Sequence, residues 1–279
     1  MAMTYLELKQ NVSRTLAASG IESFNAESQW LIAEYSGLNP LELTLSGTSE
    51  VPDKIFQKIT AAVNRRCGGE PLQYILGKAY FREIILMVNP SVLIPRPETE
   101  LLVDWVLQES PPGGSLLELG TGSGAIALSC AAERPDLHIT ASDISLEALK
   151  VAKENAGRLN LHVDFIQSDL YQNLAPGRTY DLIAANLPYV RFDEKDTLAS
   201  EVRDFEPHLA LFADQDGLEI IFRAASGLST HLKPGGKAIF ELSPPQAPVL
   251  KTFLEKLGFS SEIKLDHTRR ERFVTARMI

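Results

Sequence analysis

The chain has 279 residues, of which 44% are hydrophobic and 23% charged, and its formal net charge at pH 7 is −9. This length allows one large domain or two smaller ones, each with a buried core, and no apolar run approaches the roughly 20 residues that cross a bilayer. Surfaces that bind nucleic-acid phosphates are basic, so the acidity argues against such a partner without excluding a local basic patch.

The sequence indicates a reducing compartment. Residues 1–10 contain neither the basic nor the apolar region of a secretion signal. The two cysteines, Cys67 and Cys130, are far apart, and the five histidines lack metal-ligand spacing. We therefore expect a cytoplasmic protein with no disulfide and no metal.

Residues 1–75 are predicted to form a small helical domain. Leu8, Val12 and Leu16 recur at helical spacing, and residues 36–40 (Ser-Gly-Leu-Asn-Pro) are typical of a helix stop followed by a new start. No catalytic constellation occurs here, so we expect the domain to recognise a partner.

Residues 76–92 are predicted to be a β-hairpin linker. Glycine and proline bracket two short, apolar, β-prone runs between Gly69 and Pro90. After them, Pro95 and Pro97 hold Arg96 in a stiff, extended segment.

A helix is expected to begin at Glu98 or Thr99. Two roles stay open for Arg96: it meets an anionic group near the site, or it pairs with Glu98 or Glu100 on the surface.

The remainder, within residues 93–279, alternates strand and helix from Ser115 onward, which predicts a doubly wound α/β sheet. The expected strands are 115–119, 137–141, 162–166, 181–185 and 237–241, with two β-prone runs at 260–264 and 272–278. The expected helices are 125–132, 146–159, 217–228 and 248–257. The polar stretch 191–204 is predicted to be a mobile loop or lid.

A glycine-rich loop, residues 120–124, follows the first of these strands. Gly120, Gly122 and Ala125 fit the G-x-G-x-x-A pattern, and Asp143 follows at the distance of roughly 20 residues that is expected of a ribose-binding acid. A tight turn explains any one glycine, but the set predicts a nucleotide-like cofactor, either a dinucleotide or S-adenosylmethionine.

The candidate cofactor residues lie at strand ends. Glu118 would pair with an ammonium, Asp143 would bind the ribose hydroxyls, and Asp169 would bind the adenine amino group. The predicted set is Glu118, Gly120, Thr121, Gly122, Ser123, Gly124, Asp143, Ile144, Asp169, Leu170 and Asn186.

Asn186, Leu187, Pro188 and Tyr189 end the strand that decides the chemistry. Asn186 offers a carbonyl acceptor, and Pro188 holds Leu187 extended, which aims the Leu187 carbonyl outward. With the ring of Tyr189, these groups would hold a planar NH2 group by both hydrogens. The alternative is that Pro188 merely ends the strand and Tyr189 packs.

Nitrogen methylation suits this strand end better than hydride transfer. A dehydrogenase needs a proton donor or acceptor beside its nicotinamide, usually a histidine, lysine or tyrosine. Accepting both hydrogens of an amide would orient its nitrogen and stabilise the charge that develops as a methyl group arrives. No separate base is evident.

Nearly the whole chain resembles the release-factor glutamine methyltransferases (PrmC/HemK). The resemblance rests on residues 69–77 (Gly-Glu-Pro-Leu-Gln-Tyr-Ile-Leu-Gly), 93–100 (Leu-Ile-Pro-Arg-Pro-Glu-Thr-Glu), 119–128, 206–207 with 209–211, and 232–236 (Leu-Lys-Pro-Gly-Gly). The Pro-Arg-Pro-Glu-Thr-Glu segment is far more specific than the glycine loop.

The resemblance implies methylation of the side-chain amide nitrogen of the glutamine in the Gly-Gly-Gln motif of peptide chain release factors. It implies a class I, Rossmann-like methyltransferase domain behind the helical domain, with an antiparallel last strand. S-adenosylmethionine would lie at Gly120–Gly124, Asp143 and Asp169, and the substrate at Asn186–Tyr189 and Arg96.

Two positions depart from the family. Leu187 replaces a proline, and Leu170 replaces a frequent tryptophan that would wall the adenine. Asn-Leu-Pro-Tyr is the form in ribosomal RNA adenine dimethyltransferases, so N6-adenine methylation of nucleic acid is the alternative. The acidic charge and the segments around Tyr74 and Arg96 favour the protein substrate. The complete glycine, acid and asparagine set argues against a fold used only for binding.

Overall fold

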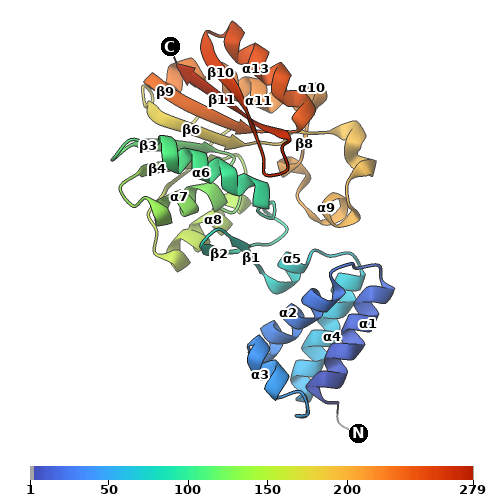
Figure 1. The fold of residues 1–279 in the computed structure, drawn as a ribbon. Coiled ribbons are helices and arrows are strands. Elements are labelled where there is room, and N and C mark those ends of the chain that lie inside the picture. The colour runs from blue at the N-terminus through green and yellow to red at the C-terminus, as the bar shows by residue number, and fades with distance from the viewer. Residues whose placement is uncertain (1–2, 279) are drawn as a thin grey trace. The chain divides into compact units, whose positions relative to one another are not determined.

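The computed structural model describes residues 3–278, which form two compact units (Figure 1). One unit contains the chain up to Gly77 together with Ser200–Phe205, and the other contains Lys78–Ala199 and the chain from Glu206 onward. Within the described range, no helix is both long enough and apolar enough to cross a membrane.

The first unit is helical, as predicted. Its helices are α1 (Tyr5–Ala18), α2 (Phe24–Ser36), α3 (Pro40–Leu45), α4 (Asp53–Cys67), α5 (Leu72–Leu76) and α9 (Ser200–Phe205). Leu8, Val12 and Leu16 are all buried in its core, which confirms the helical spacing. The Thr4 hydroxyl and the Glu7 carboxylate form a capping box that starts α1.

Arg66 on α4 forms ion pairs with residues of both α2 and α9. Arg66 Nε donates to Glu27 Oε2 at 2.6 Å, and Arg66 Nη1 donates to Glu201 Oε2 at 2.9 Å. The Glu27 side chain is only 6% exposed, so its charge depends on Arg66 for compensation.

Residues 72–76 are helical, so the β-prone run expected there is wrong. Pro71 precedes α5, and Gly77 ends it in the left-handed conformation, at φ 69°. These caps suit one helical turn, and they outweigh the β propensity of Tyr74 and Ile75. The hairpin itself forms from β1 (Lys78–Phe81) and β2 (Ile84–Met87), which pair antiparallel.

The second unit is built on a seven-stranded sheet in the order β10-β11-β9-β6-β3-β4-β5. The strands are β3 (Ser115–Leu119), β4 (His138–Asp143), β5 (Asp164–Gln167), β6 (Tyr180–Asn186), β9 (Leu232–Glu241), β10 (Phe259–Leu265) and β11 (Glu271–Met278). β9, β6, β3, β4 and β5 are parallel, while β11 is antiparallel to both of its neighbours. This confirms the mostly parallel sheet with an antiparallel last strand.

Helices cover both faces of the sheet (Figure 1). Along β6, Leu182 and Ala184 face a core with α6 (Glu100–Glu109), α7 (Ala125–Glu133) and α8 (Leu146–Leu159). Ile183 and Ala185 face a second core with α11 (Glu219–Ser226), α12 (Leu228–His231) and α13 (Ala247–Lys256). Strand alternation therefore decides which polar side chains meet at the sheet's end.

Two connecting regions differ in detail from expectation. The stretch predicted to be a loop contains a 3-10 helix, η2 (Phe192–Thr197), followed by α9, and the helix expected over 217–228 is divided into α10 (Asp214–Gly217), α11 and α12. The remaining elements are η1 (Pro97–Thr99), β7 (Val190–Arg191), η3 (His208–Ala210), β8 (Phe212–Ala213) and η4 (Pro244–Gln246). A closing motion over the site stays a prediction.

Candidate active site

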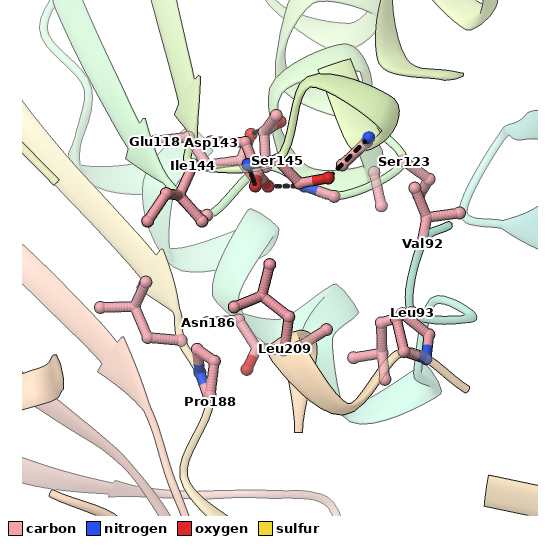
Figure 2. Close-up of a pocket in the computed structure, with 18 of the residues that line it drawn as sticks. Val92, Leu93, Glu118, Ser123, Asp143, Ile144, Ser145, Asn186, Pro188 and Leu209 are labelled. Carbon is pink, nitrogen blue, oxygen red and sulfur yellow. Dashed lines mark hydrogen bonds between the residues drawn. The ribbon is translucent and has the colours of Figure 1, made fainter. Parts of the chain in front are cut away.

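A cavity lies in the second unit at the carboxyl ends of β3, β4 and β6. The chain passes from β3 to β4 and β5 on one side and continues with β6 on the other, so the cavity marks the point where strand order reverses. Figure 2 shows Glu118 and Asp143 on one side of it, with Asn186 and Pro188 and the segment carrying Val92 on others.

The glycine loop bends sharply between β3 and α7. Gly120 has φ 75° and Gly124 has φ 85°, conformations that side chains with a Cβ rarely adopt. A Cβ on Gly124 would also lie 2.8 Å from Leu128 Cδ1. Glycine at these positions lets the loop turn tightly and lets its backbone line the cavity.

Asp143 holds the glycine loop from the end of β4. Its Oδ2 accepts from the Gly122 amide at 2.8 Å, and its Oδ1 accepts from the Ser145 amide at 2.9 Å. Burial raises the pKa of Asp143, against these backbone bonds. Ile144, half exposed beside it, contributes an apolar surface to the cavity.

Glu118 is 1% exposed and still lines the cavity. Its Oε2 accepts from the Thr121 hydroxyl at 2.7 Å and from the Ala127 amide at 3.0 Å. Burial raises the pKa of Glu118 to about 8. A cation bound in the cavity, such as an ammonium group, would stabilise the ionised form of Glu118.

Asp169 lines the cavity together with a cation that sequence reasoning missed. Arg223 Nη2 on α11 donates to Asp169 Oδ2 at 2.6 Å. Only the fold brings them together, since Arg223 carries no motif. Leu170 follows Asp169, has φ 51° and also lines the cavity. A leucine side chain therefore stands where a tryptophan of the family would form a wall beside the adenine.

The end of β6 contributes three of its four predicted residues to the cavity wall: Asn186, Leu187 and Pro188. Asn186 Nδ2 donates to Thr99 Oγ1 at 3.1 Å, which leaves its carbonyl oxygen for another donor. The Tyr189 ring instead packs against the second core, and its carbonyl accepts from Gln246 Nε2 at 2.8 Å. Burial raises the pKa of Tyr189 to about 12, so this hydroxyl stays neutral.

Arg96 also lines the cavity, and its partner is Glu206 rather than Glu98 or Glu100. Arg96 Nη2 lies 2.7 Å from Glu206 Oε1, and Glu206 Oε2 accepts from the Ile94 amide at 3.3 Å. The Arg96 side chain is 29% exposed, so it reaches solvent while the buried Glu206 carboxylate holds it in place.

The cavity therefore combines three carboxylates with a strand end that carries the Asn186 side-chain carbonyl. Three acids spaced along apolar walls fit an elongated ligand that carries a cation, a diol and an amino group. The Asn186 carbonyl fits an N–H donor. Among residues 3–278, no group of histidine, cysteine, aspartate or glutamate could hold a metal ion.

Comparison with known proteins identifies both units. The family model for the methyltransferase small domain matches residues 97–204, and that for the PrmC N-terminal domain matches residues 7–77. The release factor glutamine methyltransferase of Neisseria gonorrhoeae is 40% identical over 235 residues, 84% of this chain and 86% of that protein. The protein of that name from Deinococcus radiodurans is 34% identical over 277 residues, 99% of each chain.

Solved structures share the fold alone. A methyltransferase from Pyrococcus furiosus superposes with a TM-score of 0.53 at 22% identity, covering 70% of this chain and 89% of that one. A T. thermophilus 16S rRNA methyltransferase, in complex with AdoMet and guanosine, gives 0.52 at 18% identity, covering 72% and 50%.

Proposed function

This chain belongs to the release factor glutamine methyltransferases, and from that premise we propose that it methylates peptide chain release factors. The acceptor is the side-chain amide nitrogen of the glutamine in their Gly-Gly-Gln motif. The donor is S-adenosylmethionine, which supplies a methyl group on a positively charged sulfur.

Each of three acids binds a different group of the donor. Glu118 pairs with its ammonium, Asp143 accepts from its ribose hydroxyls, and Asp169 accepts from its adenine amino group. Support for these roles comes from the position of all three in the cavity lining and from the backbone bonds that hold Asp143. The ion pair with Arg223 holds the Asp169 carboxylate in place.

Asn186 Oδ1 and the Leu187 carbonyl accept the two hydrogens of the substrate amide. A carboxamide nitrogen is a weak nucleophile because its lone pair is delocalised, and two acceptors favour positive charge on it as the methyl group arrives. Holding it in line also removes the entropy cost of the encounter. Arg96, fixed by Glu206, is proposed to contact the substrate beside the glutamine. A stacking role for Tyr189 stays a prediction.

The observation that carries the proposal is the hydrogen bond from Asn186 Nδ2 to Thr99 Oγ1. It turns the Asn186 carbonyl away from Thr99, as binding of an amide N–H requires. The helical unit, matched by the PrmC N-terminal domain, is proposed to dock the release factor. Since release factors act in translation, we assign the protein to the cytoplasm.

The proposal is tested by incubating the protein with methyl-labelled S-adenosylmethionine and either a release factor or ribosomal RNA. Label is expected in the release factor. Label in the RNA alone would overturn the proposal and favour adenine N6 methylation.

A further inference from the structure

A buried carboxyl group lies beside Asn186 and has no role in the chemistry above. In the register of β6 with β9, Glu241 is the direct neighbour of Asn186. Alternation places both on the sheet face that α6 covers, because Ala184 and Ile239, two residues before each, pack in that core. Glu241 is 1% exposed, and neither of its carboxyl oxygens has a partner in strict hydrogen-bond geometry.

Thr99 completes the group from the opposite side. It occupies the N-cap position of α6 and is 4% exposed, yet its side chain makes no capping hydrogen bond. Its hydroxyl instead accepts from Asn186 Nδ2 at 3.1 Å. Thr99 has helical backbone angles, φ −66° and ψ −18°, because η1 runs directly into α6, so its hydroxyl is free to bond Asn186.

We propose that Glu241 is a positioning residue, which acts on the neighbouring Asn186 amide both directly and through the Thr99 hydroxyl, and so fixes which end of that amide faces the substrate nitrogen. This inference rests on the proposed function. An asparagine side chain can present either its carbonyl or its NH2 group, and only the carbonyl accepts from the substrate amide.

The polarity follows from what each group can donate. A hydroxyl alone fixes nothing, because it can accept from Asn186 Nδ2 or donate to Asn186 Oδ1. An ionised carboxylate only accepts, so Glu241 takes the hydroxyl hydrogen of Thr99. The Thr99 oxygen is then left as an acceptor for Nδ2, and Oδ1 of Asn186 faces the substrate.

Protonation of Glu241 would reverse this chain of hydrogen bonds. A protonated carboxyl group donates to the Thr99 oxygen, and the freed hydroxyl hydrogen then favours Asn186 Oδ1. Burial raises the pKa of Glu241 to about 7, while the Thr99 hydroxyl and the Asn186 side-chain amide both lower it.

The surrounding charges also bear on this titration. Glu98 raises the pKa of Glu241 and Arg272 lowers it, while the neutral phenol of Tyr189 adds no charge. Since the active arrangement requires the ionised form, methyl transfer should be lost as the pH falls through about 7.

Four variants separate this positioning role from simple packing. Thr99→Val and Glu241→Gln should lower kcat by about 10- to 100-fold, with KM for either substrate changed by less than about threefold. Thr99→Ser keeps the hydroxyl, so its kcat should stay close to the wild-type value. Thr140→Val is the matched control, since Thr140 lies in the same sheet and its buried hydroxyl has no hydrogen-bond partner.

The pH profile gives a readout that a packing role would not change. The wild-type profile should decline below about pH 7, and Glu241→Gln should abolish that decline. A folded Glu241→Gln protein that keeps the wild-type decline, or a Thr99→Val protein with wild-type kcat, would overturn the proposal.

NMR tests the chain of hydrogen bonds without any methyl transfer. In the free protein, the side-chain NH2 signals of Asn186 should titrate at the same pH as the Glu241 carboxyl carbon, and Glu241→Gln should remove that titration. A titration of the Asn186 signals that survives Glu241→Gln would overturn the inference. Failure of the wild-type protein to methylate a release factor would overturn the proposed function instead, and the titration would still decide the inference.

Discussion

The Leu187 side chain lies directly over Gly120, and a Cβ on Gly120 would fall 2.9 Å from Leu187 Cδ2. Leu187 is 5% exposed, so the residue that departs from the family joins the glycine loop to the strand end that is proposed to bind substrate. The Leu187 side chain therefore packs between the glycine loop and the end of β6.

The contact predicts a specific effect of Gly120→Ala. Gly120 has φ 75°, and alanine in the left-handed region costs about 1–2 kcal/mol. The added methyl group also displaces Leu187 into the cavity, so cofactor affinity should fall by about tenfold or more. Gly113→Ala is the control, since Gly113 has φ 65° with nothing near its Cβ. Calorimetric titration showing equal affinity in both variants would contradict the contact's importance.

Replacement of Leu187 by the proline of the family should retain methyl transfer within about tenfold. The Leu187 carbonyl and the restraint from Pro188 are unchanged by it. The smaller side chain leaves a gap over Gly120, so the free energy of unfolding should fall by roughly 1–3 kcal/mol. Urea unfolding and initial rates measure the two effects. A folded but inactive Leu187→Pro protein would show that the backbone here differs from the family's.

Cofactor binding should release a proton from Glu118 at pH 7. Its folded pKa of about 8 lies above the ordinary value of 4.5 because burial disfavours the charge. A positively charged ligand lowers that pKa, so binding expels the proton below pH 8. Titration calorimetry in buffers of different ionisation enthalpy measures the release, and Glu118→Gln should reduce it.

The same shift affects stability without the cofactor. Because the folded pKa is raised, the stability that Glu118 contributes is present below pH 4.5 and is lost as the pH rises toward 8. Glu118→Gln should flatten the pH dependence of unfolding over this window. An unchanged dependence would assign the titration to another group, such as Asp143, whose charge acts on Glu118.

Adjacent arginines in α4 should differ widely in their effect on the helical unit. Arg66→Ala leaves the buried Glu27 carboxylate without its partner, which should cost about 3–5 kcal/mol. Arg65→Ala breaks an ion pair whose arginine is 47% exposed and should cost about 0–1 kcal/mol. Urea unfolding of both full-length variants makes the comparison, and equal losses would contradict a buried role for Arg66.

Local chemistry was sufficient to predict much of the catalytic unit. The expected strand 115–119 and helix 146–159 coincide with β3 and α8, because hydrophobic period and capping residues agree there. The prediction failed at Leu72–Leu76, where an apolar run too short to show a period was decided by its caps.

Long-range pairing explains what the sequence could not show. Glu241 becomes the neighbour of Asn186 only through the register of β6 with β9. Likewise, α11 brings Arg223 to Asp169, and the second core removes the Tyr189 ring from the cavity wall. None of these residues carries a local pattern that distinguishes it from an ordinary core or surface residue.

Mass spectrometry of a release factor after reaction with S-adenosylmethionine tests the central claim most directly. We expect one added methyl group, on the glutamine of the Gly-Gly-Gln motif, and no methylation by Asn186→Ala, which should still bind the cofactor. Methylation at any other residue, or unchanged methylation by Asn186→Ala, would contradict the account.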